Sequence, residues 1–300
     1  MGGNIISSKS KLFAIIGDPI THCMSPVIMN SSFRRLGLDN VFVAMHCAVE
    51  DIDVVMKALR AINLSGYVVT MPLKERVVPY LDEMRDEAEI SGVVNCIQND
   101  NGRLIGHNTD SKGFWAAIQE KNTDAHPIKV DNLFILGMGG LAKAVAIQAA
   151  MQGVCNITAA NRIEDVLFVE SFKVFSKKLC AKFPQVKMTF LPWEPNKWKA
   201  NLADADVIIN VTPNGLESTD TLSTEFPYEN APQKALFFDS PAVMTTPFLQ
   251  KAEKRGHRVI NGVELNAHQG VYAFEIMTGH SVQYQDMRND ALMYLRENGS

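Results

Sequence analysis

Residues 133–144 read LFILGMGGLAKA, an apolar run that passes into a glycine turn and then into a helical segment. Gly137, Gly139 and Ala142 fill the three small-residue positions of the dinucleotide fingerprint: one for the tight turn, one for close approach of backbone to phosphate, and one for packing of helix against strand. Amides from Gly140 onward would point at the phosphates and add the helix dipole. The stretch therefore predicts a pyrophosphate site, although similar glycine turns occur in folds that bind nothing.

The next apolar segment favours a nucleotide site as well. Residues 154–160 are followed by Asn161, Arg162 and Glu164. In a dinucleotide-binding sheet, the residue that contacts the ribose lies at this place, after the second strand. A carboxylate there accepts hydrogen bonds from both ribose hydroxyls, whereas an arginine pairs with a 2'-phosphate. The residues themselves leave the choice between NAD and NADP open.

Strands alternate with helical segments along both halves of the chain, which is typical of a parallel, doubly wound α/β sheet. In the second half, further strands are predicted at residues 206–211 and 235–239. The first half has no glycine fingerprint and therefore predicts a separate α/β domain that supplies substrate-binding groups. Its expected elements are strands at residues 11–17, 41–47 and 66–70 and helices at residues 27–36 and 51–62.

The junction between the two domains is expected just after Asp110, with a helix beginning at about Lys112. Residues 267–278 and 286–297 are helical in pattern and are expected to return to the first domain. The predicted organisation is an N-terminal α/β substrate domain, residues 1–111 completed by the C-terminal helices of residues 263–300, and a Rossmann-type NAD(P)-binding domain, residues 112–262.

Composition and charge argue for small polar metabolites as partners. The 300-residue chain is 46% hydrophobic, enough for two sizeable cores, and its net charge of -4 argues against a nucleic-acid or acidic membrane partner. No apolar run approaches the ~20 residues of a membrane span, and the first residues, MGGNIISSKSK, lack a secretory apolar core. We therefore expect a cytoplasmic protein. The oligomeric state stays open, with a homodimer as one candidate.

Cysteine and histidine spacing predicts no metal site. The 5 cysteines are scattered and form no CxxC pair, which favours reduced thiols over a disulfide framework or a zinc site. The 7 histidines include no HExxH pair.

Three polar clusters follow predicted strands in the first domain, where open α/β sheets place their ligands. Ser25 in the first cluster is either a helix N-cap or a substrate donor. Lys74 in the second is either a solvated surface charge or a catalytic group, and Asp110 in the third is either part of a capped turn or a catalytic partner. The clusters are PITHCMSP (residues 19–26), TMPLK (residues 70–74) and GHNTDSKG (residues 106–113).

With these motifs in order, the chain resembles the shikimate dehydrogenase family, which includes the quinate/shikimate enzymes. The resemblance runs nearly end to end and implies an N-terminal substrate domain, a Rossmann domain, and hydride transfer between a nicotinamide and a cyclic polyol carboxylate. The segments that carry it are GDPITHCMSP, VTMPLKE, SGVVNCI, GHNTD, GMGGLAKA, the NR pair at residues 161–162, NVTPNGL and GVELNAHQGVYAFEIMTG.

Carried over by residue, the resemblance implies that Lys74 is the general acid in the reducing direction and, when neutral, the base in the oxidising direction. Asp110 would hold its side chain in place. The substrate contacts implied are Cys23, Ser25, Thr70, Asn95 and Gln269. The cofactor contacts implied are Gly137, Gly139, Gly140, Leu141, Ala142, Asn161, Arg162, Glu164, Thr212, Gly262 and Leu265.

Several residues depart from the family pattern. Cys23 stands where the first of two serines usually grips the substrate carboxylate, and a thiol is the weaker donor. Val68 replaces a usual asparagine, and residues 239–247 lack a usual tyrosine. In the tail, Glu264 and Leu265 replace a common glycine and a common methionine. These substitutions leave the particular ring acid open.

The residues after the NR pair bear on the cofactor. Ile163, Glu164 and Asp165 stand where NADP-preferring members tend to carry basic or threonine side chains. Two carboxylates repel a 2'-phosphate, so NAD is the preferred prediction, and Arg162 keeps NADP as the second.

Two alternatives to a shikimate or quinate dehydrogenase remain. One is a paralogue that acts on a different cyclic polyol or amino-substituted acid. The other is a non-catalytic dinucleotide-binding protein, against which the retained Lys74 and Asp110 argue.

Overall fold

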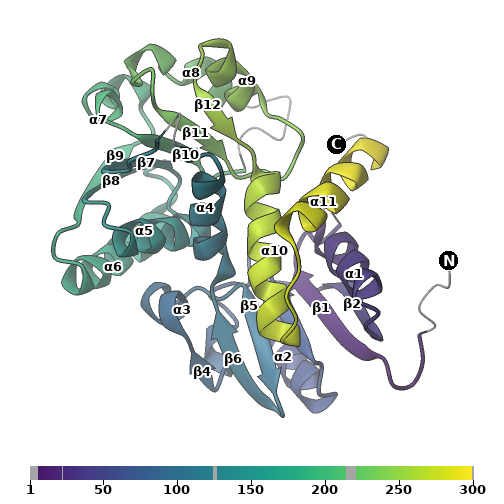
Figure 1. Ribbon diagram of the computed structural model, residues 1–300. Helices are drawn as coiled ribbons and strands as arrows, with labels where there is room; N and C mark the ends of the chain where they lie inside the picture. The colour runs from purple at the N-terminus through teal and green to yellow at the C-terminus, as the bar shows by residue number, and fades with distance from the viewer. Residues whose placement is uncertain (1–5, 22, 124–126, 214–220, 299–300) are drawn as a thin grey trace. The chain divides into compact units, whose positions relative to one another are not determined.

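The helices and strands of the computed structural model, which describes residues 6–21, 23–123, 127–213 and 221–298, group into two units. Unit 1 spans Met1–Gly113 and Asn266–Ser300, and unit 2 spans Phe114–Leu265. Each unit contains a six-stranded sheet with helices, which confirms the predicted α/β class (Figure 1). The unit boundaries lie inside two helices, α4 (Thr109–Glu120) and α10 (Gly262–Thr278).

The sheet of unit 1 is mixed. Its order is β2-β1-β3-β5-β6-β4, with β1 parallel to both β2 and β3, and with β5 and β6 paired antiparallel. Asn101 and Gly102 close this hairpin with φ of 52° and 92°, as a two-residue turn of this kind requires. The strands are β1 (Lys11–Gly17), β2 (Asn40–His46), β3 (Gly66–Val69), β4 (Glu83–Met84), β5 (Cys96–Asp100) and β6 (Arg103–His107).

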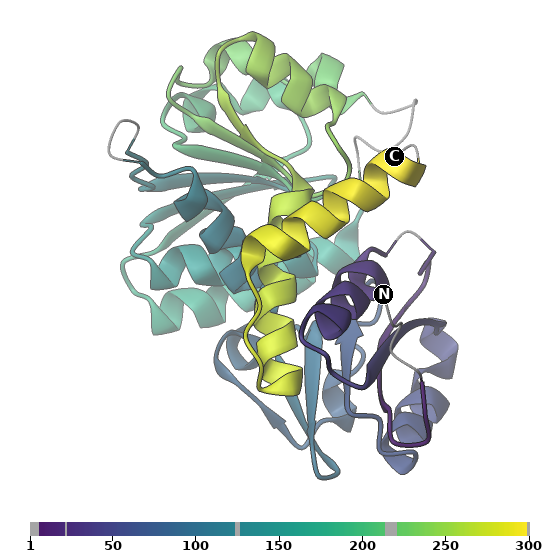
Figure 2. The ribbon, with the colours of Figure 1, turned by 45° about the vertical axis from the view of Figure 1, so that its right-hand side comes forward.

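Helices of unit 1 complete its core. Helix α11 lies along α1 (Figures 1 and 2), and Arg35 of α1 pairs with Asp286 at 3.6 Å and with Asp290 at 2.9 Å. Tyr67 and Val69 of β3 are fully buried in a core that also takes residues from α2. The helices are α1 (Ser25–Arg35), α2 (Ile52–Ala61), α3 (Asp86–Ser91) and α11 (Tyr284–Asn298), with 3-10 turns η1 (Val49–Asp51) and η2 (Val78–Tyr80).

Two helix starts differ from the predictions, and both bear on the site. Helix α1 begins at Ser25, because Pro26 fits the first helical turn and so does not exclude the residue before it. Ser25 is therefore not an N-cap. Helix α4 begins at Thr109 and not at Lys112, because Oδ1 of Asn108 accepts the backbone N–H of Ser111 at 3.3 Å in the manner of an N-cap.

Unit 2 is a parallel sheet of the order β12-β11-β10-β7-β8-β9. Numbered within the unit this is 6-5-4-1-2-3, the arrangement of Rossmann folds, in which the strand order reverses between β7 and β10. Parallel strands of this kind are covered on both faces, and β7, β10 and β11 are accordingly buried almost throughout. The strands are β7 (Asn132–Leu136), β8 (Asn156–Asn161), β9 (Lys187–Pro192), β10 (Val207–Asn210), β11 (Leu236–Asp239) and β12 (Arg258–Ile260).

In unit 2, the second strand begins two residues later than the apolar segment that predicted it. Strand β8 begins at Asn156 and not at residue 154, because the N–H of Val154 still caps the preceding helix by donating to the carbonyl of Ala149 at 3.0 Å. The helices are α5 (Gly140–Met151), α6 (Val166–Lys182), α7 (Lys199–Ala203), α8 (Leu222–Glu225) and α9 (Pro247–Lys254), with 3-10 turns η3 (Pro195–Lys197) and η4 (Tyr228–Asn230). In the part of the chain that the structure describes, no helix is both long and apolar enough to cross a membrane.

Candidate active site

Lys74 and Asp110 form an ion pair within unit 1. Lys74 Nζ lies 2.5 Å from Oδ2 of Asp110, which stands in the first turn of α4. The two side chains are 18% and 10% exposed, so the pair is sheltered but open to solvent at the ammonium. A charge-assisted hydrogen bond of this length holds the lysine in one place, and the carboxylate also complements the helix dipole.

Backbone hydrogen bonds fix the loop that carries Lys74. The carbonyl of Lys74 accepts from Val94 N–H at 2.9 Å, and the carbonyl of Asn95 accepts from Val69 N–H at 2.8 Å. Asn95 in turn donates its backbone N–H to the carbonyl of His107 at 3.1 Å. The ends of β3, β5 and β6 are thereby tied together, and Asn95 is held beside the lysine.

The Asn95 side chain links Asp110 to two further polar residues. Its Nδ2 donates to Oδ1 of Asp110 and to Oγ1 of Thr109, both at 2.9 Å, while its Oδ1 accepts the backbone N–H of Thr109 at 2.6 Å. Oε1 of Gln269, on α10, lies 3.2 Å from Thr109 Oγ1 and 3.4 Å from Asn95 Nδ2. The structure thus brings four of the predicted site residues, Lys74, Asp110, Asn95 and Gln269, into one hydrogen-bonded cluster.

Thr109 is the member of this cluster that the sequence did not single out. Its side chain is buried at the start of α4 and contacts both amide side chains. The available signal was its place between two polar residues in GHNTD, directly after an apolar strand. We call Lys74, Asn95, Thr109, Asp110 and Gln269 the Lys74 cluster.

Cys23 lies near enough to Lys74 for the two groups to interact electrostatically. Burial raises the pKa of the Cys23 thiol above its usual value, and the positive charge of Lys74 opposes this rise only in part. The group facing the lysine at neutral pH is therefore an uncharged thiol, a weak hydrogen-bond donor.

Ser25 and Thr70 are two further predicted substrate contacts, at the start of α1 and directly after β3. Ser25 is buried in the first turn of α1. Thr70 directly follows β3, donates its N–H to the carbonyl of Ile16 at 2.9 Å, and packs against Gly17, where a Cβ would lie only 2.3 Å from its methyl group. Among the described residues, no hydrogen bond joins either side chain to the Lys74 cluster.

The glycine turn of unit 2 has the geometry of a phosphate-binding loop. Gly137 follows β7 at φ +114°, a conformation that favours glycine, and a Cβ there would come within 2.9 Å of Thr212 and 3.0 Å of Val211. The turn therefore lies at the switch point between β7 and β10. A Cβ on Gly139 would meet no atom within 4 Å, so the backbone at the start of α5 is open to a ligand.

Other predicted cofactor residues lie at the same end of this sheet. Gly140, Leu141 and Ala142 form the first turn of α5, and Ala142 is fully buried. A pyrophosphate placed at this turn would meet free helical N–H groups and the positive end of the helix dipole. The residues present thus fit a dinucleotide.

Buried polar side chains hold Thr212 in place after β10. Oδ1 of Asn210 accepts from the N–H of Thr212 at 3.1 Å and from its hydroxyl at 2.6 Å. Nδ2 of Asn210 donates to Asp239 at 2.9 Å, and Asp239 accepts the hydroxyl of Thr246 at 2.5 Å. Sequence analysis assigned no role to Asn210, Asp239 or Thr246, although each is a polar residue at or beyond the end of an apolar strand.

The predicted ribose readers follow β8. Asn161 is buried and donates from Nδ2 to the carbonyl of Arg162 at 3.1 Å, which shapes the turn. The side chains of Arg162, Glu164 and Asp165 are exposed beyond it. Both the arginine and the carboxylates are therefore available to a nucleotide.

Gly262 and Leu265 begin α10. A Cβ on Gly262 would lie 2.1 Å from the carbonyl oxygen of Ser240 and 2.5 Å from that of Pro241, so only glycine fits this close contact after β11. Leu265 is buried in the same helix.

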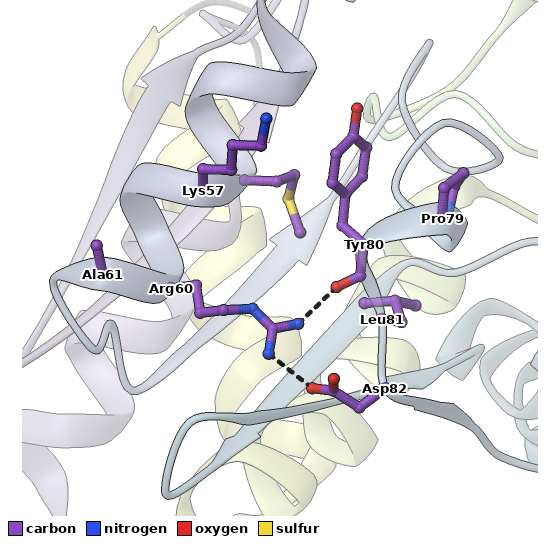
Figure 3. A pocket seen from close by; sticks show the side chains of 8 residues that line it. Lys57, Arg60, Ala61, Pro79, Tyr80, Leu81 and Asp82 are labelled. Atoms are coloured by element: carbon purple, nitrogen blue, oxygen red, sulfur yellow. Dashed lines mark hydrogen bonds and ion pairs between the residues drawn. The ribbon is translucent and has the colours of Figure 1, made fainter.

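One pocket of unit 1 lies apart from the Lys74 cluster. It has a volume of about 420 Å³ between α2 and η2, and none of its lining residues belongs to the cluster (Figure 3). Arg60 donates to Asp82 at 2.9 Å and to the carbonyl of Tyr80 at 2.7 Å, and Lys57 pairs with Asp53 at 2.7 Å. Arg60 thus holds α2 to the segment at η2, whereas Lys57 is paired within α2.

Comparison with known proteins places this geometry in a family. Residues 15–97 match the model of the shikimate dehydrogenase substrate binding domain. The chain is 32% identical over 292 residues to a shikimate dehydrogenase (NADP(+)) of Desulforamulus reducens, an alignment that covers 96% of this chain and 97% of the relative.

Solved structures agree over nearly the whole chain. A shikimate dehydrogenase in complex with NADP+ superimposes with a TM-score of 0.85 at 30% identity, covering 98% of each chain. A shikimate 5-dehydrogenase from Listeria monocytogenes, solved with shikimate and NAD, gives a TM-score of 0.84 at 30% identity, again over 98% of each chain.

These similarities and the two α/β units define the chain as an NAD(P)-dependent oxidoreductase. The fingerprint turn of unit 2 is consistent with that class. The chain belongs to the shikimate dehydrogenase family.

Proposed function

We propose that this protein interconverts shikimate and its 3-dehydro ketone, with Lys74 as the general acid and base. The observation that carries the proposal is the 2.5 Å contact of Lys74 Nζ with Asp110 inside a polar cluster. Relatives named as shikimate dehydrogenases, and a similar structure that holds shikimate, support the choice of substrate.

The reaction transfers one hydride, which carries two electrons, and one proton. A nicotinamide held by the glycine turn of unit 2 would supply the hydride for the ketone carbon, or accept the one that leaves the alcohol carbon. In the reducing direction the Lys74 ammonium gives its proton to the ketone oxygen, and in the oxidising direction neutral Lys74 takes the hydroxyl proton. Asp110 holds Nζ in one position through both directions.

The proposed substrate contacts are of two chemical kinds, amides and hydroxyl or thiol groups. The amides of Asn95 and Gln269 both donate and accept, which suits the hydroxyls of a polyol ring. Ser25, Thr70 and Cys23 are the proposed hydroxyl and thiol contacts, with Ser25 and Cys23 directed to the carboxylate. A site built to pair with hydroxyls rejects analogues that lack one.

We assign substrate binding and cofactor binding to the two predicted domains. Residues 1–111 with 263–300 bind the substrate, and residues 112–262 bind the dinucleotide through the glycine turn, Thr212 and the residues after β8. Gly262 and Leu265 are proposed as contacts at the nicotinamide end.

We propose NAD as the preferred cofactor, since Glu164 and Asp165 place two carboxylates against the single charge of Arg162. NADP is the alternative, favoured by Arg162 and by the names of the relatives.

The test of the function uses the purified full chain. Shikimate and quinate are each mixed with NAD and with NADP, and the absorbance of the reduced nicotinamide is followed. Turnover of shikimate supports the proposal. Binding of either cofactor in a thermal-shift experiment without turnover of either acid rejects it.

Cys23 favours a second candidate, a paralogue that acts on another cyclic polyol or amino-substituted acid. A neutral thiol beside Lys74 gives a weaker grip on a carboxylate than a hydroxyl does. Turnover of such an acid at a KM well below that for shikimate would select this candidate.

A further inference from the structure

Thr109 occupies the centre of the Lys74 cluster. It is 1% exposed at the first position of α4, and its hydroxyl oxygen lies 2.9 Å from Asn95 Nδ2 and 3.2 Å from Gln269 Oε1. Its backbone N–H reaches Oδ1 of Asn95 at 2.6 Å. One residue therefore contacts both of the amides that are proposed to bind substrate.

The donors and acceptors around Asn95 allow one arrangement. Because Oδ1 of Asn95 accepts the N–H of Thr109, its Nδ2 must face the other way. The two hydrogens of Nδ2 then go to the two acceptors at 2.9 Å, Thr109 Oγ1 and Asp110 Oδ1. The backbone N–H at position 109 thus sets the amide orientation that gives Asp110 its second hydrogen bond, and this contact does not depend on the Thr109 side chain.

The hydroxyl proton of Thr109 then orients Gln269. With its oxygen accepting from Asn95, the hydroxyl has one proton to give, and two acceptors lie in range: Gln269 Oε1 at 3.2 Å and Asn95 Oδ1 at 3.3 Å. Asn95 Oδ1 already accepts the Thr109 N–H at 2.6 Å, so we assign the proton to Gln269 Oε1. Nε2 of Gln269 is turned to the opposite side, where it donates to the carbonyl of Asn266 at 3.2 Å. Without the hydroxyl, Gln269 Oε1 would keep only the longer contact with Asn95 Nδ2, at 3.4 Å, and its orientation would be held less firmly.

We propose that Thr109 is a positioning residue whose hydroxyl fixes the orientation of the Gln269 amide, beside the amide of Asn95, for substrate binding. The proposal rests on the proposed function, because it takes these amides as substrate contacts. Lys74 keeps its bond to Asp110 Oδ2 whatever the hydroxyl does, so the substrate complex is affected and the proton transfer is not.

The experiment compares Thr109→Val with Thr109→Ser and a matched control. Thr109→Val removes the hydroxyl at nearly constant volume, and we expect KM for shikimate to rise roughly tenfold, the effect of leaving one buried acceptor unpaired, with kcat changed by less than about threefold. Thr109→Ser keeps the hydroxyl and should restore the wild-type KM. Ser111→Ala, which removes a buried hydroxyl that donates to the carbonyl of Asn108 in the same turn, should leave KM unchanged.

The possible outcomes distinguish a failure of this inference from a failure of the proposed function. If the wild-type protein turns over shikimate and Thr109→Val has the same KM as wild type, the inference alone is overturned. This holds even if the variant melts at a lower temperature. A rise in KM that Thr109→Ser fails to reverse also overturns it. If Thr109→Val does not fold, Thr109→Ala carries the same expectation. Wild-type protein that does not turn over shikimate defeats the proposed function itself.

Discussion

Asn95 donates from Nδ2 to Oδ1 of Asp110 at 2.9 Å and so leaves the other carboxylate oxygen to Lys74. The carboxylate is held from both sides and cannot rotate away from the ammonium without breaking one of these bonds. The position of Lys74 Nζ is therefore defined before any substrate arrives, which is the kind of preorganisation that catalysis uses.

Replacing Asp110 by asparagine tests this arrangement. Asp110→Asn keeps the shape of the side chain but removes its charge, and we expect kcat to fall by about 100-fold, roughly 2.7 kcal/mol of transition-state stabilisation. Steady-state turnover at saturating substrate measures the loss. Asp53→Asn, which neutralises the exposed partner of Lys57, is the matched control and should keep wild-type kcat. Equal kcat values in all three proteins would contradict the role given to Asp110.

Cys23→Ser tests the carboxylate contact. A hydroxyl donates a stronger hydrogen bond than a neutral thiol, so KM for shikimate should fall by about three- to tenfold. Initial rates over a range of shikimate concentrations give this value. Cys155→Ser in unit 2, whose thiol contacts the carbonyl of Gly153, should leave KM as it is. An unchanged KM in Cys23→Ser would remove Cys23 from the substrate contacts.

Glu164→Ala tests the choice of cofactor. Loss of a carboxylate beside the ribose removes repulsion of a 2'-phosphate and a hydrogen-bond acceptor for the diol, so the ratio of kcat/KM for NAD to that for NADP should fall about tenfold. Glu170→Ala removes an exposed carboxylate farther along α6 and serves as the control. A ratio that stays constant in Glu164→Ala would show that another residue reads the ribose.

We expect His257 to make the stability of the protein depend on pH. Burial lowers the pKa of this imidazole, whose ring centroid lies 4.7 Å from that of Phe237, and two backbone carbonyls oppose the shift only in part. The unfolded chain therefore binds a proton more readily than the folded one, so this contribution to stability is present above about pH 6.5 and is lost as the pH falls below it.

Urea unfolding followed at several pH values between 5 and 8 measures this effect. Wild type should show a falling midpoint below pH 6.5, and His257→Gln should show a shallower fall. Parallel curves for the two proteins would mean that His257 is not responsible.

The sequence predicted those parts of the fold that local patterns specify. The apolar run into the glycine turn at Gly137 identified β7 and α5, because the turn needs a residue at positive φ. The antiparallel hairpin β5–β6 was not predicted, although Asn101 and Gly102 carry a strong turn signal. The start of α4 was placed too late because the capping role of Asn108 was not recognised.

The candidate site was predictable only as separate motifs. Lys74 lies in the loop after β3, Asn95 directly precedes β5, and Asp110 lies in the first turn of α4. Nothing in the periodicity of the chain says that this carboxylate bonds both of the other side chains. Thr109 could not be distinguished from an ordinary turn residue, since its importance lies in contacts to Asn95 and Gln269 that exist only after the strands pair. The resemblance to a family supplied the grouping that composition and spacing do not.

The most direct test of the account is the turnover number of Lys74→Met with shikimate and the preferred cofactor. The account predicts a fall of at least 100-fold, because no other group replaces the acid and base at the reacting oxygen, while cofactor binding and the melting temperature stay near wild type. Lys57→Met, at a lysine paired with a carboxylate on the surface of α2, should keep full turnover. Turnover of Lys74→Met within about threefold of wild type would contradict the account.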